Sequence, residues 1–73
     1  MRPDARDAAL LWDMLTHAQV VRTFVAGRTW SDYESDPLLQ AGVERHVITI
    51  GEAAWNVSEA LQKAHPEIPW RPI

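Results

Sequence analysis

The sequence predicts an all-α fold built as an antiparallel helical hairpin. Two long segments carry apolar residues at alternating steps of three and four, a spacing that places them along one face of a helix. A polar connection of about ten residues joins the two segments, and such a short connection makes neighbouring helices run in opposite directions. The 73 residues form at most one domain, covering residues 1–73.

The first helix is expected at about residues 4–26. Asp4 can cap its start, and Gly27 most easily takes the left-handed conformation that closes a helix. No proline interrupts the segment between them. Its apolar stripe consists of Leu11, Met14, Ala18, Val21 and Val25.

Residues 29–35, about the middle of the connection, are expected to form a short turn. Thr29, followed three residues later by Asp32, is typical of the start of a helical turn. Trp30 and Tyr33 in this turn have two interpretations. The simpler one is that both rings cover one end of the hairpin, and the other is that they stack on a ligand.

The second helix is expected at about residues 37–64, because Asp36-Pro37 is a favoured pair for a helix start and Pro66 disfavours helical geometry at the residue before it. Its apolar stripe consists of Val43, Val47, Ile50, Ala54, Val57, Leu61 and Ala64. A parallel polar line consists of Arg45, Thr49, Glu52, Asn56, Glu59 and Lys63. Pro69 can then begin a further helix at residues 69–73.

Apolar residues extend beyond these two stripes. Trp12 and Phe24 lie beside the stripe of the first helix, and Ile48 and Trp55 lie beside that of the second. A lone hairpin covers only one side of each helix, and monomers rarely expose large apolar patches. We therefore expect the hairpin to be completed by oligomerisation, as a homodimer or higher homo-oligomer.

Composition narrows the classes of function. The net charge of −3 argues against a nucleic-acid binder that depends on a basic surface. The absence of cysteine removes disulfides and thiolate metal sites. The N-terminus lacks the apolar run of a signal peptide, and no segment approaches the ~18 apolar residues of a membrane span. We expect a cytoplasmic protein without membrane contact, metal or cofactor.

Few titratable residues have spacings that suggest chemistry. His17 follows Asp13 by one helical turn, which is more often a surface contact than an acid–base or metal pair. His46 is expected to be partly buried and hydrogen-bonded. Glu52 and Glu59 are seven residues apart, and they fit either a paired-carboxylate site or, more simply, a solvated stripe. The residues alone indicate an acidic helical hairpin and no specific activity.

Two motifs carry a resemblance to a known family. They are the run Ile-Gly-Glu-Ala-Ala from Ile50 to Ala54, and the run Pro-Glu-Ile-Pro-Trp-Arg from Pro66 to Arg71. Supporting runs, in the same order along the chain, are 13–15, 24–27 and 43–45. The chain resembles the HepT-like branch of the HEPN superfamily over nearly all of its length.

This resemblance implies a four- or five-helix bundle that dimerises and acts as a metal-independent endoribonuclease toxin. The implied partner is a minimal nucleotidyltransferase antitoxin, which neutralises the toxin by modifying a tyrosine. The family's catalytic motif is Arg, four to six residues, then His-x-Tyr, on the helix that follows the Pro-Trp-Arg segment. No arginine of this sequence is followed by such a histidine.

The catalytic motif is therefore expected to lie beyond Ile73. The sequence ends at Ile73, about where the helix that carries the motif in the family should begin. The sole tyrosine, Tyr33, and Arg71 do not match the motif. No catalytic residue is assigned within residues 1–73.

Glu52 and Asn56 match helix positions that can face the dimer cleft of a full-length relative, where they would have a supporting role. The favoured expectation is a truncated HepT-like protein that holds the first part of the bundle and lacks ribonuclease activity, so that RNA would be bound only by a full-length form. One alternative is a non-enzymatic interaction module. Another is an unrelated enzyme that uses Asp13, His17 or Glu52.

Overall fold

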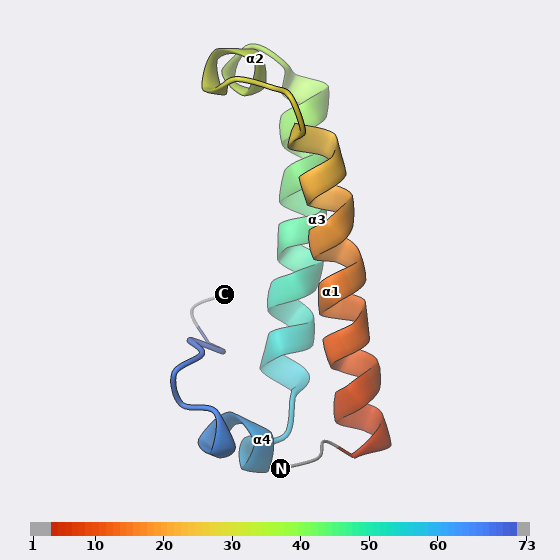
Figure 1. Cartoon of the computed structure of the whole chain (residues 1–73), viewed down its shortest axis with the longest axis vertical. Helices are drawn as coiled ribbons and strands as arrows, with labels where there is room; N and C mark the ends of the chain where they lie inside the picture. Colours follow the sequence, from red (N-terminus) through yellow and green to blue (C-terminus); the bar gives the residue numbers. More distant parts are fainter. Residues whose placement is uncertain (1–3, 72–73) are drawn as a thin grey trace.

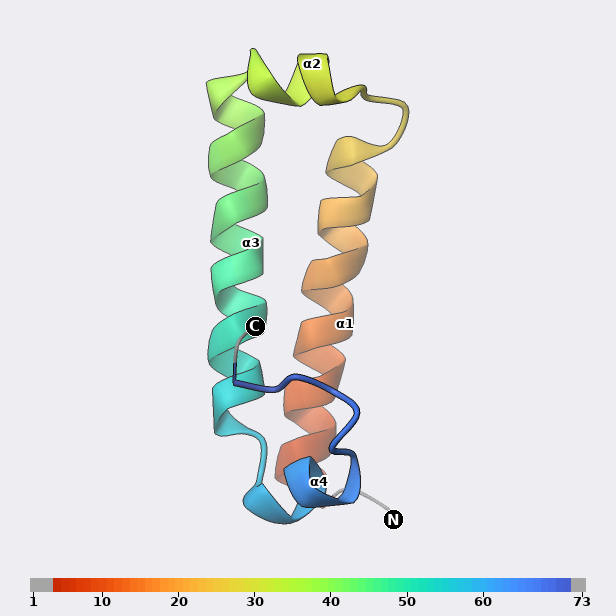
Figure 2. The same ribbon diagram turned by 90° about the vertical axis from the view of Figure 1, so that its left-hand side faces the viewer.

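The computed structural model describes residues 4–71. Within this range it contains helices α1 (Ala5–Val25), α2 (Trp30–Glu34), α3 (Pro37–Asn56) and α4 (Glu59–Ala64), and no strand. Helices α1 and α3 lie side by side, α2 crosses one end of the pair, and α4 lies at the other end (Figures 1 and 2). The prediction of an all-α fold with an antiparallel hairpin is therefore confirmed.

Helix α1 begins and ends as its sequence predicts. The Asp4 carboxylate accepts a hydrogen bond from the backbone N–H of Asp7 at 2.7 Å, which satisfies one of the unpaired donors at the helix start. At the other end the chain leaves the helix at Ala26, and Gly27 adopts a φ of 72°. A side chain at that position would be strained, so glycine suits this turn.

The tip of the hairpin is held by local hydrogen bonds. Thr29 and Asp32 form a reciprocal capping box, which starts α2 and lowers the pKa of the Asp32 carboxyl through the bond from the Thr29 backbone. The side-chain amide of Gln40 on α3 donates to the carbonyl oxygens of Tyr33 and Glu34, at 2.9 and 3.0 Å. Helix α2 is thereby fixed to the first turn of α3.

The two aromatic residues of the tip do not share one role. Their rings stack on each other with centroids 5.5 Å apart. Tyr33 is half-buried, but the Trp30 side chain is 71% exposed. The prediction that both rings cover the end of the hairpin is therefore wrong for Trp30.

The prediction of one continuous helix over residues 37–64 is also wrong, because the chain leaves helical geometry at Val57, where ψ is 140°. Ser58 then caps α4, with its hydroxyl oxygen accepting from the N–H of Leu61 at 3.2 Å. The side-chain amide of Gln62 donates to the carbonyl of Val57 at 2.8 Å, which satisfies a group that the break leaves outside the helical ladder.

Asp7 gives the physical reason for this break. Its carboxylate accepts hydrogen bonds from both the backbone N–H and the hydroxyl of Ser58, at 2.8 and 2.5 Å. Asp7 is almost fully buried, with 2% of its surface exposed, so both oxygens need partners. The Ser58 N–H can meet Asp7 only if it is not used in a continuous helix. The bonds from the Ser58 hydroxyl and N–H lower the pKa of Asp7.

The hydrophobic core lies at this same end of the hairpin. Leu10, Leu11 and Met14 of α1 pack against a cluster of buried residues that comprises Ala54, Val57, Leu61 and Trp70. The indole N–H of Trp70 donates to the carbonyl of His65 at 3.1 Å, so its polar atom is satisfied within the core.

The further helix expected at residues 69–73 does not begin where the sequence predicts. Trp70 and Arg71 lie in a turn rather than in a helix. The rest of that expected helix, up to Ile73, falls outside the described residues. The indole of Trp70 is buried in the core, which holds this segment against the hairpin.

The hairpin is elongated and leaves large apolar side chains exposed, among them Trp12, Leu38 and Ile48. Its extents are 42 × 20 × 17 Å, and its radius of gyration is 14.3 Å, against about 11 Å for a compact domain of this length. The accessible surface is 5370 Å², whereas a compact monomer of this mass exposes about 4600 Å².

In the described part of the chain, no helix is both long and apolar enough to cross a membrane.

Replacement of Leu61 by alanine is expected to lower the free energy of unfolding by roughly 2–5 kcal/mol, because it leaves a cavity in the core. Leu38→Ala is the matched control, since Leu38 is 83% exposed and Leu61 only 3%. The control should change the free energy by no more than about 0.5 kcal/mol. Urea unfolding followed by far-UV circular dichroism measures both. Equal effects of the two substitutions would contradict this location of the core.

The buried Asp7 carboxylate predicts a loss of stability in acid. Its pKa in the folded chain lies below the ordinary value of 3.8, so below about pH 4 the unfolded chain binds a proton that the folded chain does not. The stabilisation is present above this range and is lost as the pH falls through the folded pKa. Asp7→Asn should be less stable than the native chain at pH 7 and should lose less stability between pH 4.5 and pH 2.5, as measured by urea unfolding. Asp13→Asn, which alters an exposed carboxylate on the same helix, should retain the native acid sensitivity.

Candidate functional site

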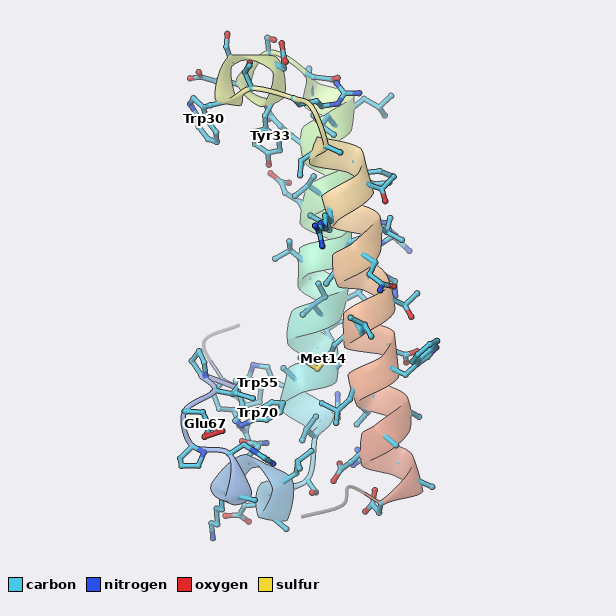
Figure 3. The ribbon with its side chains drawn as sticks, in the orientation of Figure 1. Met14, Trp30, Tyr33, Trp55, Glu67 and Trp70 are labelled. Atoms are coloured by element: carbon cyan, nitrogen blue, oxygen red, sulfur yellow. The ribbon has the colours of Figure 1, made fainter. Side chains whose placement is uncertain are left out.

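The candidate site lies on the exposed face of the second half of α3. Glu52 and Asn56 lie there, together with two apolar side chains that solvent reaches, Ile48 at 60% and Trp55 at 54% exposure. Glu52 follows Ile48 by four residues, and Trp55 and Asn56 follow Glu52 by three and four, so all four lie on one side of the helix. Figure 3 shows Trp55 projecting toward the segment that carries Trp70. The exposed strip formed by Ile48, Glu52, Trp55 and Asn56 is called the α3 face below.

Glu52 and Asn56 are placed differently within this face. The side-chain amide of Asn56 donates to the backbone carbonyl of Glu52 at 2.8 Å, so it supports the last turn of α3. The Glu52 carboxylate is exposed and has no hydrogen bond or ion pair within residues 4–71. It lines a shallow hollow of about 380 Å³ with Glu44, Arg45 and neighbouring residues of α3. Both signs of charge are therefore available there to a polar partner.

Arg71 borders the α3 face from the C-terminal segment. Its guanidinium lies 4.1 Å from the centre of the Trp55 ring, which is close enough for a cation–π interaction. Its Nε also donates to the side-chain oxygen of Gln62 on α4, at 3.4 Å. Arg71 therefore links the segment after α4 to the exposed tryptophan of α3.

The catalytic motif is expected beyond Ile73. That residue lies outside the described residues, so the location of the motif stays a prediction.

Glu52 and Glu59 do not form a paired-carboxylate site. The break at Val57 and Ser58 places Glu59 on α4, where its carboxylate forms an exposed ion pair with Lys63 at 3.2 Å. The polar line predicted along one helix is therefore interrupted. Exposed pairs of this kind contribute little to stability.

His17 contacts a residue that the sequence analysis did not connect with it. Its Nδ1 lies 2.6 Å from Nδ1 of His46, across the seam between α1 and α3. The edge of the Phe24 ring packs against His46, with ring centroids 5.5 Å apart. The prediction of a half-buried, hydrogen-bonded His46 is confirmed. The expected surface contact of His17 with Asp13 is not what holds His17, which is half-buried and hydrogen-bonded to α3.

The third histidine is separate from this pair. His65 ends α4 and lies 3.2 Å from the Glu67 carboxylate, an arrangement that suits the negative end of the helix dipole when the ring is protonated. Over residues 4–71, no three side chains of histidine, aspartate or glutamate gather as metal ligands would.

A second hollow lies at the tip of the hairpin, where the sequence left a ligand-stacking role open. It has a volume of about 340 Å³ and is lined by Val25, Arg28, Thr29, Trp30 and Tyr33. The Arg28 guanidinium lies 3.5 Å from the Asp36 carboxylate, so its charge is already compensated. The hollow is therefore largely apolar.

Sequence reasoning misses two residues that organise the structure. By residue type alone, Asp7 is only a favourable charge in the first turn, and Ser58 belongs to a continuous helix. A weak signal for the break exists in Asn56-Val57-Ser58, because these three residue types have low helix propensity and serine favours helix caps. The link between Asp7 and Ser58 has no sequence signal, since 51 positions separate them.

Comparison with known proteins gives consistent matches. The family model described as "Ribonuclease HepT-like" matches residues 14–73. A protein of Thermococcus cleftensis named "Probable ribonuclease HepT" is 33% identical over 61 residues, covering 84% of this chain and 56% of that protein. One of Methanocaldococcus jannaschii named "Putative RNase MJ0127" is 30% identical over 63 residues, covering 86% and 52%. The chain thus spans about half the length of these curated relatives. No solved structure matches.

Proposed function

The chain belongs to the ribonuclease HepT-like family, and from this membership we propose that it supplies the helical scaffold of a HepT-like toxin. The match over residues 14–73 is the observation that carries the proposal, because it covers the second half of α1, all of α3 and the Pro-Trp-Arg segment. In this proposal the 73 residues provide the surface for assembly. They do not by themselves cleave RNA.

The lack of a catalytic motif in the sequence supports the second part of this proposal. Family activity depends on an arginine followed, after four to six residues, by His-x-Tyr, and residues 1–73 contain no such arrangement. The histidines that are present have structural partners in His46, His17 and Glu67. General acid–base catalysis of RNA cleavage needs a side chain placed to reach the 2′-hydroxyl or the leaving oxygen. His17 and His46 bond to each other across the hairpin, and His65 bonds to Glu67 two residues further along the chain.

Self-association through the α3 face is the assembly that we propose. Ile48 and Trp55 expose apolar surface next to Glu52 and Asn56, an arrangement typical of an interface with an apolar centre and a polar edge. Glu52 would then serve at the edge of a dimer cleft and not as an acid or base. A non-enzymatic interaction module would use this same surface. The solution-mass measurement described below therefore tests that alternative as well.

The proposed heterologous partner is a minimal nucleotidyltransferase antitoxin, as in the family, with the encounter taking place in the cytoplasm. The sole tyrosine, Tyr33, lies in α2 at the hairpin tip and outside any His-x-Tyr sequence. Modification of a motif tyrosine is therefore not proposed for these residues. Binding of the antitoxin to this chain would instead depend on the helical surface.

The purified 73-residue chain is expected to leave RNA intact, because it lacks the side chains that promote the reaction in the family. The measurement is gel analysis of a structured RNA incubated with the chain in EDTA, at a large molar excess of protein. A control incubation without protein sets the background. Metal-independent cleavage that co-elutes with the chain in size-exclusion chromatography would contradict the proposal.

The chain is expected to associate in solution at micromolar concentration, with a mass of about twice 8.3 kDa by light scattering if it forms a dimer. Ile48→Glu should shift it to the monomer, because it places a charge at the apolar centre of the α3 face. Leu38→Glu is the matched control, since Leu38 is exposed but lies in the first turn of α3. A native chain that remains monomeric, or equal behaviour of the two variants, would contradict the α3 interface.

A further inference from the structure

The histidine pair is unlike the rest of the seam between the two long helices. Within the described residues, the contact between Nδ1 of His17 and Nδ1 of His46 is the one side-chain to side-chain hydrogen bond between α1 and α3. The two ring centroids are 4.9 Å apart, and the Phe24 ring packs edge-on against His46. Both histidines are half-buried, so water does not fully replace this bond if it is lost.

The chemistry of imidazole limits the number of protons that this pair can hold. A neutral ring has one N–H donor and one bare nitrogen acceptor, whereas a protonated ring has two donors. The 2.6 Å separation requires one Nδ1 to donate and the other to accept. Two neutral rings satisfy this requirement, and so does one neutral ring with one protonated ring. Two protonated rings do not, because two N–H groups and two positive charges would then face each other.

We propose that His17 and His46 form a proton-sharing clasp that closes the α1–α3 seam at neutral pH and opens it in mild acid. The pair lies near the middle of α1, far from the Asp7–Ser58 link at one end and from the capping box of the tip at the other. Its opening would separate the two helices between those fixed ends. The proposal does not depend on ribonuclease activity or on the α3 face.

The charged groups near the pair do not neutralise a second proton. Asp13 precedes His17 by one turn on α1, and Glu44 and Arg45 precede His46 on α3. All three are exposed, and no ion pair joins any of them to either ring in the described chain. Helices α2 and α4 pack at the ends of the hairpin (Figure 1), so their charged groups do not face the clasp. A second positive charge would be repelled by the first without a compensating carboxylate.

The direction of the pH effect follows from proton linkage. In the unfolded chain each histidine is free to bind a proton near pH 6.5, the ordinary range for this side chain. A folded chain that keeps the bond between the two Nδ1 atoms has no place for a proton on both of these nitrogens, so in mild acid the unfolded chain binds one proton more. Stability therefore falls as the pH falls. One excluded proton lowers the folding equilibrium constant about tenfold between pH 7.5 and pH 5.5. This pH range lies well above the range in which the Asp7 carboxylate is protonated, so the two effects can be separated.

Urea unfolding at pH 7.5 and 5.5, with EDTA present to remove metal ions, tests the clasp. The folding equilibrium constant of the native chain should be about tenfold lower at pH 5.5 than at pH 7.5. In His17→Gln the loss should be less than about twofold, because a glutamine carbonyl can accept a hydrogen bond from a protonated His46. His65→Gln is the matched control, since the His65 ring bonds to Glu67 and not to the histidine pair, and this substitution should leave the tenfold loss in the folding equilibrium constant unchanged. A native chain equally stable at both pH values, or a His17→Gln chain that is as acid-sensitive as the native one, would overturn the proposal.

Nitrogen-15 NMR of the native chain gives a second test that does not depend on whether a variant folds. At pH 8 the hydrogen bond between the two Nδ1 atoms requires one of the pair to be in the Nδ1–H tautomer and the other in the Nε2–H tautomer. Free histidine side chains have no such requirement, and His65 provides an internal comparison. Detection of one Nδ1–H ring in the pair supports the clasp. Two Nε2–H rings would overturn it.

Discussion

The bond between Asp7 and Ser58 is the constraint on which the arrangement of this chain depends. A nearly buried carboxylate in the first turn of α1 takes both donors of a serine that would otherwise continue a helix. The second long helix must therefore end at Asn56, and α4 starts in a new direction. That change of direction brings Leu61 and the returning Trp70 onto Met14 and its neighbours. One polar interaction thus determines where the hydrophobic core forms.

The two ends of the hairpin are stabilised by different means. At the open end, buried apolar side chains and the Asp7 carboxylate connect parts of the chain that are distant in sequence. At the tip, the capping box of Thr29 and Asp32 and the two bonds from Gln40 connect neighbours. Between these ends the seam has half-buried valines and the histidine pair. Such a hairpin is well defined at its ends, and its outer faces remain available for contact, as expected for a scaffold.

Local features were predictable from the sequence, and features that depend on distant partners were not. Asp4, Gly27, Thr29 and Asp36 each act within a few residues, so helix starts and ends could be predicted from residue type. The helix break at Val57 could not, because its cause is a carboxylate on another helix. The contact of His17 with His46 depends on the register between α1 and α3, which periodicity leaves open. Of the candidate site, the sequence located Glu52 and Asn56 on one helix face, but the separation of Glu59 followed only from the break.

The position of Asp7 also affects which residues a fragment of this chain needs in order to keep the Asp7–Ser58 link. The family match starts at residue 14, which lies inside α1 and after the carboxylate that holds Ser58. A fragment cut at the start of that match would retain the residues that identify the family and lose the donor–acceptor pair that orients α4. The sequence similarity therefore begins later in the chain than the residues that hold the structure together. A fragment for expression should include Asp7 and should not begin at residue 14.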